Sequence, residues 1–320
     1  MKRMKYILII IMIGIAPLSC VISEGHSRVV EYVRYSYDNS KFVSFSGSAV
    51  FIWKKDGTFL RDMQFADYVS SISSNDDLTE LIVALNNGQI VVYDVENSLI
   101  TNSFYSNSDK ISQVVLHNNT IVASSWDGKI RKWDRNGVLI DVYDTEDPIY
   151  CLSVCDKYYV IGNENGNVKI FNPIKKRIKT LYSHNDEVND VFISKSCNHF
   201  VSGSIDGRII LYCINDEKKV IIECGAGVTS VVISEDEKTI VSGSWDDTIK
   251  IWDISGKLIK SFNAHSEAVT TVDLSSDGKN IISGYYDKDI KIWSIRGELI
   301  RTIGLSKIIK YFNRKMWNID

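Results

Sequence analysis

Three side-chain types that build a hydrolytic triad occur near the end of the chain: His265, Ser283 and Asp287. A serine beside a histidine that an acid orients is an arrangement used for acyl transfer. The sequence has no G-x-S-x-G elbow, phosphate loop, H-E-x-x-H motif, zinc-spaced cysteines or EF-hand loop. We therefore expect no metal and no cofactor, and the meaning of these three residues depends on the elements that carry them.

The six cysteines do not have the spacing of a metal site or a disulfide framework. Cys20 belongs to the N-terminal segment, which leaves an odd number in the rest of the chain. Cys151 and Cys155 fall on one expected strand, too far apart along it to bridge each other. The pattern predicts buried free thiols.

Residues 1–19 have the order of a secretory signal: three basic residues, an apolar run over 7–16 and a small residue before Cys20. The run is too short to span a bilayer. The segment resembles the lipobox of bacterial lipoproteins, in which this cysteine is diacylated, although Pro17 stands where that family has Leu. We expect export to the cell envelope, a lipid anchor at Cys20 and a tether over 20–28. The alternatives are simple secretion, an uncleaved anchor and an accidental pattern.

A repeat of 38 to 41 residues occurs seven times from residue 29 onward, and its pattern is clearest at 241–259. Apolar and polar side chains alternate over 249–252, as a half-buried strand requires. An aromatic residue closes this strand in every copy: Trp53, Tyr93, Trp133, Phe171, Tyr212, Trp252 and Trp293. Six residues earlier stands a turn residue: Gly47, Asn87, Asp127, Asn165, Asp206, Asp246 and Asp287. Four of these precede Gly, which favours two-residue hairpins.

These repeats resemble the WD40 family, whose Trp-Asp signature appears at residues 133–134 and 252–253. The resemblance implies an all-β fold over 29–304, a seven-bladed propeller closed into one ring of four-stranded blades. Blade one is expected to have strands at 29–35, 41–46, 49–53 and 58–65. Blade seven is expected to have strands at 268–274, 280–284, 289–293 and 297–303. All four of its strands would then come from this one repeat, with none supplied by the N-terminal segment.

In this family a His, a Ser or Thr, an Asp and the Trp form a buried hydrogen-bonded tetrad that orients a turn. The full set here is His265, Ser283, Asp287 and Trp293. The resemblance therefore gives these residues a structural role and predicts that the protein is not an enzyme. Two blades keep partial sets: His184, Ser202, Asp206 and Tyr212 in blade five, and Cys224, Ser242, Asp246 and Trp252 in blade six.

In the repeats, apolar side chains recur at every second residue. In residues 305–320 they recur at every third or fourth residue, and the basic residues lie mostly between them. This pattern predicts a short amphipathic helix. The helix could cap the propeller, lie on an anionic membrane or bind a partner. The net charge of the chain is −3, and loss of the three basic residues in 1–19 would make it about −6. Nucleic acid is therefore not an expected partner.

In a propeller, the turns between the second and third strands share one face with the loops between blades. The residue before each turn residue lies around the mouth of this face, and three of the seven are large aromatics: Trp126, Trp245 and Tyr286. They are candidates for binding a protein or peptide partner, or for packing on a neighbouring loop. We expect a non-catalytic interaction scaffold that is tethered to the envelope. The alternative is a propeller enzyme or small-ligand sensor that uses the central channel.

Overall fold

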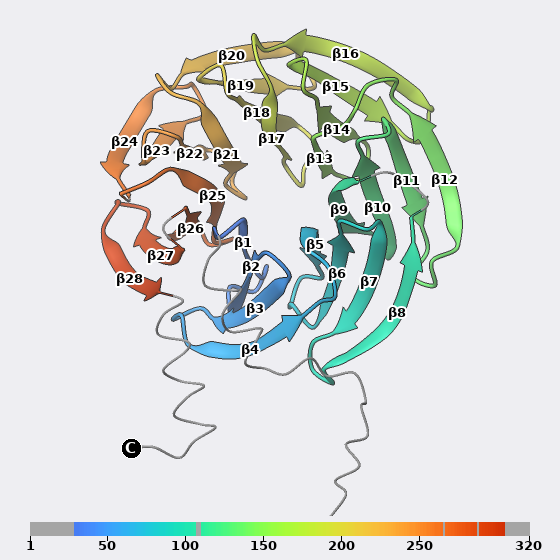
Figure 1. The fold of residues 1–320 in the computed structure, drawn as a ribbon. Coiled ribbons are helices and arrows are strands. Elements are labelled where there is room, and N and C mark those ends of the chain that lie inside the picture. Colours follow the sequence, from blue (N-terminus) through green and yellow to red (C-terminus); the bar gives the residue numbers. More distant parts are fainter. Residues whose placement is uncertain (1–28, 107–109, 265, 287, 305–320) are drawn as a thin grey trace, which may run out of the picture.

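The computed structural model describes residues 29–106, 110–264, 266–286 and 288–304. They form seven antiparallel sheets of four strands, arranged as blades around a central channel (Figure 1). The predicted seven-bladed all-β fold is confirmed. No helix occurs among these residues, and so none that could cross a membrane. The predicted signal (1–19), tether (20–28) and C-terminal helix (305–320) lie outside the described residues.

Each blade runs from its innermost strand, a, to its outermost strand, d. The strands of blades one to three are β1 (Tyr32–Tyr35), β2 (Lys41–Ser46), β3 (Ala49–Lys54), β4 (Phe59–Gln64), β5 (Val69–Ser74), β6 (Glu80–Leu85), β7 (Gln89–Asp94), β8 (Leu99–Tyr105), β9 (Ile111–His117), β10 (Thr120–Ser125), β11 (Lys129–Trp133) and β12 (Leu139–Asp144).

Those of blades four to seven are β13 (Cys151–Val154), β14 (Tyr159–Gly162), β15 (Asn167–Asn172), β16 (Arg177–Ser183), β17 (Val188–Ile193), β18 (His199–Ser204), β19 (Arg208–Cys213), β20 (Lys218–Glu223), β21 (Val228–Ile233), β22 (Thr239–Ser244), β23 (Thr248–Asp253), β24 (Leu258–Asn263), β25 (Val269–Leu274), β26 (Asn280–Tyr285), β27 (Asp289–Ser294) and β28 (Leu299–Gly304).

The turn between strands b and c differs from the expected two-residue hairpin. In blade five, Gly207 N donates to Ser204 O, and Gly207 has φ of 80° while Asp206 does not have a positive φ. This is a type I turn followed by a left-handed glycine. Asp206 serves instead as an acceptor, because its Oδ1 receives the N–H of Arg208 at 3.0 Å. The turn residue is therefore selected for its side-chain oxygen and the Gly for its backbone.

Apolar side chains fill the space between neighbouring blades. At the b strands of blades five, six and seven, a glycine allows a valine of the next blade to approach. A Cβ built on Gly203, Gly243 or Gly284 would lie 2.6 Å from a methyl group of Val228, Val269 or Val30, respectively. The last of these contacts joins blade seven to blade one.

Among the described residues, the ring closes without a strand exchanged between blade one and blade seven. Blade seven contains β25, β26, β27 and β28 in order, as predicted. Blade one packs against it, with Ile282, Ile290 and Ile303 in the same apolar cluster as Val33 and Phe42. Closure is therefore noncovalent and depends on a complete seventh blade.

One expectation for the cysteines is wrong. Cys155 and Cys197 form a disulfide, with Cα atoms 6.0 Å apart. They lie 42 residues apart, about one repeat, so the fold places them on neighbouring blades four and five. Sequence spacing within one strand could not reveal this pairing. Cys151 and Cys224 are buried free thiols, as predicted.

A chain that stops at Ile295 lacks β28 and should not form a stable ring. The outer edge of β27 would be unpaired and the cluster shared with blade one would lose Ile303. We expect aggregation, or loss of the cooperative thermal transition measured by circular dichroism. Deletion of residues 21–28 is the control, with a Tm change within about 2 °C. The opposite result would mean that the N-terminal segment closes the ring.

Candidate functional site

The predicted tetrad of blade seven is described only in part, because His265 and Asp287 lie outside the described residues. The Trp293 indole donates to Ser283 Oγ at 2.8 Å, and that oxygen also lies 2.6 Å from the Tyr285 hydroxyl. Ser283 is completely buried. The same indole-to-serine bond occurs in two other blades, between Trp53 and Ser44 and between Trp252 and Ser242. The bond is thus a repeated element of blade structure.

Blade five completes its polar set with a residue that sequence reasoning missed. His184 Nε2 lies 2.7 Å from Ser202 Oγ, and His184 Nδ1 lies 3.1 Å from Asp206. The Tyr182 hydroxyl, 3.0 Å from Ser202, takes the place of the indole that Tyr212 cannot supply. Burial is the main cause of the lowered pKa of His184, which keeps the ring neutral at pH 7.

Three of the blades that lack this histidine, blades three, four and six, use a cation from strand c. Lys250 Nζ contacts Asp246 at 2.7 Å and the Cys224 carbonyl oxygen at 2.8 Å. Blades three and four use residues at the matching position, two before the aromatic: Arg131 pairs with Asp127, and Lys169 with Asp147. These buried cations bind the turn to the loop, as histidine does in blade five.

The three predicted binding aromatics are all exposed on the loop face. The exposed fractions of Trp126, Trp245 and Tyr286 are 44%, 50% and 52%. They belong to blades three, six and seven, so Trp126 lies across the ring from the other two (Figure 1). The structure therefore does not bring the three together into one patch.

Trp126 belongs to a pocket at the mouth of the channel. Its ring stacks on Tyr150 of blade four, with centroids 5.3 Å apart, and Lys110 Nζ lies 4.5 Å from its centroid. The ring thus packs on a neighbouring loop, as one expectation had it, and exposes almost half of its surface, while partner binding stays a prediction. The mouth pocket has a volume of about 400 Å³ and is lined chiefly by Glu31, Tyr68, Asn86, Lys110, Trp126, Tyr150 and Asn189.

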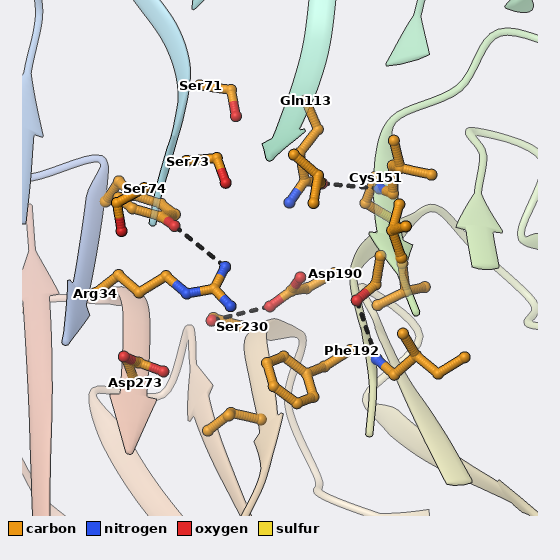
Figure 2. Close-up of a pocket in the computed structure, with 18 of the residues that line it drawn as sticks. Arg34, Ser71, Ser73, Ser74, Gln113, Cys151, Asp190, Phe192, Ser230 and Asp273 are labelled. Carbon is orange, nitrogen blue, oxygen red and sulfur yellow. Dashed lines mark hydrogen bonds between the residues drawn. The ribbon is translucent and has the colours of Figure 1, made fainter. Parts of the chain in front are cut away.

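The central channel, about 870 Å³, is lined by the seven innermost strands. Its polar side chains mostly join one blade to the next. An oxygen on strand a accepts a backbone N–H from strand a of the following blade, at 2.7 to 3.3 Å. The pairs are Ser71 with Val114, Ser73 with Leu116, Gln113 with Leu152, Ser153 with Ile193, Asp190 with Val231, Ser230 with Val272, and Asp273 with Tyr35. Figure 2 shows Gln113, Asp190 and Ser230 in this ring.

Arg34 departs from this ring of acceptors, because a guanidinium has no acceptor atom. It extends into the channel toward Asp190, with Asp273 nearby (Figure 2). Burial raises the pKa of both carboxyls to about 6, and the charge of Arg34 opposes that rise. Arg34 therefore offsets part of the cost of two carboxylates that the fold uses as caps.

The far end of the channel is crossed by a side-chain contact. Lys195 Nζ of blade five lies 3.3 Å from the ring centroid of Tyr37 in blade one. These blades are not neighbours, so the pair spans the channel at the end opposite the mouth pocket. No group of three or more His, Cys, Asp or Glu that could hold a metal ion occurs in the described part of the chain.

Comparison with known proteins gives a consistent result. Residues 99–134 and 256–294 match the family model described as WD domain, G-beta repeat, and residues 132–246 match a Vps42 beta-propeller model. The chain is similar to autophagy-related protein 16 of Arabidopsis thaliana, with 28% identity over 54% of this chain and 36% of that protein. It is also similar to the protein groucho of Drosophila melanogaster, with 24% identity over 53% of this chain and 24% of that protein. The matched region is thus well under half the length of either relative.

Replacement of both channel carboxyls by Asn should stabilise the protein at neutral pH. The amide oxygen can still cap the neighbouring N–H, and the two carboxylate charges are removed from the channel. The native pKa of Asp190 and Asp273 lies above the unfolded value near 3.9. Ionisation of these carboxyls therefore lowers the free energy of unfolding, fully above about pH 6 and no longer below about pH 4. We expect the double variant to exceed the original free energy of unfolding by about 1 to 3 kcal/mol at pH 7.5.

Urea unfolding of both proteins between pH 5 and 7.5 measures this difference, which should shrink as the pH falls. The exposed Asp216→Asn is the control and should show no such trend. A double variant that is less stable at pH 7.5 would mean that the carboxylate charge itself is required.

Proposed function

Because this chain is a seven-bladed propeller built from WD40 repeats, we propose that it is a non-catalytic scaffold that binds a protein or peptide partner on its loop face. The observation that carries the proposal is the exposure of large aromatic rings around the channel mouth. Such rings give a large contact area for little loss of conformational entropy. A rigid ring that holds them at fixed positions lowers the cost of binding.

The polar groups of the channel favour this scaffold over a channel enzyme or sensor. Seven of the side-chain oxygens that line it already accept backbone N–H groups from neighbouring blades. Ser283, the serine of the triad-like set, is buried inside a blade and away from the channel lining. The mouth pocket, in contrast, presents aromatic and polar side chains at an accessible surface.

We also propose that the scaffold is exported and attached to the cell envelope through lipid on Cys20, with the loop face free to reach its partner. The sequence of residues 1–20 motivates this proposal. The Cys155–Cys197 disulfide supports it, since disulfides persist mainly in oxidising compartments. The anchor residue itself lies outside the described residues.

Single replacement of the loop-face aromatics by Ala should weaken partner binding. Trp126→Ala, Trp245→Ala and Tyr286→Ala each remove an exposed ring, and at least one should cost more than about 1 kcal/mol of binding free energy. Partners captured from native envelope fractions would be titrated against each variant by biolayer interferometry, after a thermal melt confirms folding.

Lys175→Ala and Lys176→Ala, in the turn between β15 and β16 on the opposite face, are the controls for this experiment. If these controls weaken binding while the three aromatic variants do not, the site has been placed on the wrong face.

Cys20→Ser should release the protein from the membrane fraction. Without the thiol no lipid can be attached, so labelling with a fatty-acid analogue should disappear and the protein should move to the soluble fraction. Cys213→Ser, at a free and partly exposed cysteine, is the matched control and should leave both properties unchanged. An original protein that is already soluble and unlabelled contradicts the anchor.

A further inference from the structure

The loop face next to the mouth pocket carries an excess of acidic side chains. The loops and turns of blades four and five contribute Glu146, Glu164, Asp186 and Glu187, of which Glu146, Glu164 and Asp186 are exposed. Two cations of these loops are paired, Lys169 with Asp147 and Arg208 with Glu223, and Lys110 lies over the Trp126 ring. The surface between these loops is therefore negative.

The acidic loops adjoin the aromatic wall of the pocket. Tyr150 N donates to Gly162 O at 2.9 Å, two residues before Glu164, and Val188 N, next to Glu187, donates to Asn163 O at 3.1 Å. Burial, together with the charges of Glu164 and Glu187, raises the pKa of the Tyr150 hydroxyl. Tyr150 in turn stacks on Trp126. One continuous surface thus combines aromatic faces with carboxylates, and we name it the acidic sector: Trp126, Tyr150, Glu164, Asp186 and Glu187.

The opposite face of the ring has a different character. Its turns between strands c and d carry basic and acidic side chains together, including Lys55, Lys175 and Lys257 beside Asp56, Asp216 and Glu217. The negative charge of the acidic sector is therefore a local feature of the loop face and does not follow from the small net charge of the chain.

We propose that the acidic sector binds a lysine- or arginine-containing segment of a protein partner, with one basic side chain entering the mouth pocket. The proposal rests on the proposed function and specifies the chemistry of the partner. Aromatic faces attract ammonium and guanidinium groups. An incoming cation would take the place on the Trp126 ring that the Lys110 ammonium now holds, 4.5 Å from the ring centroid. The surrounding carboxylates would steer and orient such a segment.

Synthetic peptides test this chemistry directly. Three fluorescent Gly/Ser peptides of one length would carry four Arg, four Gln or four Glu at the same positions, and their Kd for the full chain would be measured by anisotropy at about 0.15 M salt. We expect the Arg peptide to bind at least about tenfold more tightly than the Gln peptide, and the Glu peptide to bind more weakly than either.

Two variants locate the binding surface. Trp126→Ala, and the pair Glu164→Gln with Glu187→Gln, should each weaken Arg-peptide binding by about fivefold or more. The pair Asp216→Asn with Glu217→Gln makes the same charge change on the opposite face and should alter Kd by less than about twofold, since solvent screens distant exposed charges.

Three results would overturn the inference: equal affinity for the Arg and Gln peptides, no measurable binding, or an equal loss in the opposite-face pair. Tighter Arg-peptide binding after Lys307, Lys310, Arg314 and Lys315 are changed to Gln would also overturn it, because the occupant would then be this chain's own basic segment. If the peptides fail but Trp126→Ala still weakens capture of the natural partner, the proposed function stands without this specificity.

Discussion

The open edge of each innermost strand is the constraint on which the ring depends. Strand a pairs with strand b on one side only, so several of its N–H groups have no partner within the blade. Side-chain oxygens of the preceding blade accept these N–H groups at six of the seven junctions described above. An exposed row of unpaired N–H groups is a site for aggregation, and here it becomes the joint between blades.

This constraint also explains why most polar residues of the channel have a structural role. The polar residues that line the channel look like a ligand site when only their types are considered, but most of them cap a neighbouring backbone. Inside the blades, the His184 set and the Lys250 contacts bind turns to loops in the same way. Chemistry that could serve a partner is left to the loop face, where Trp126 and Tyr150 are not needed to satisfy backbone groups.

Much of the fold was predictable because it follows a period. The seven aromatics and their turn residues determine the number of blades, and alternation determines the strands within them. What could not be predicted depends on contacts between repeats: Tyr182 bonding to Ser202 of the next blade, Arg34 between two carboxylates, and the disulfide of Cys155 with Cys197. The exposed state of Trp126 was predictable from its place in the turn, but its stacking on Tyr150 was not, since that ring comes from the next blade.

Blade four shows how these contacts support a binding surface. Its inner strands, β13 and β14, have four residues each, so few backbone hydrogen bonds join them. Two interactions add to the caps at its innermost strand: the buried Lys169, which ties its strand c to the preceding loop, and the disulfide, which joins it to blade five at the end away from the mouth pocket. A covalent link at one end restricts how the blade can tilt, and therefore limits the movement of Tyr150 and Glu164 at the other. The loops can then be presented in nearly the geometry that binding needs, which lowers the entropy lost on association.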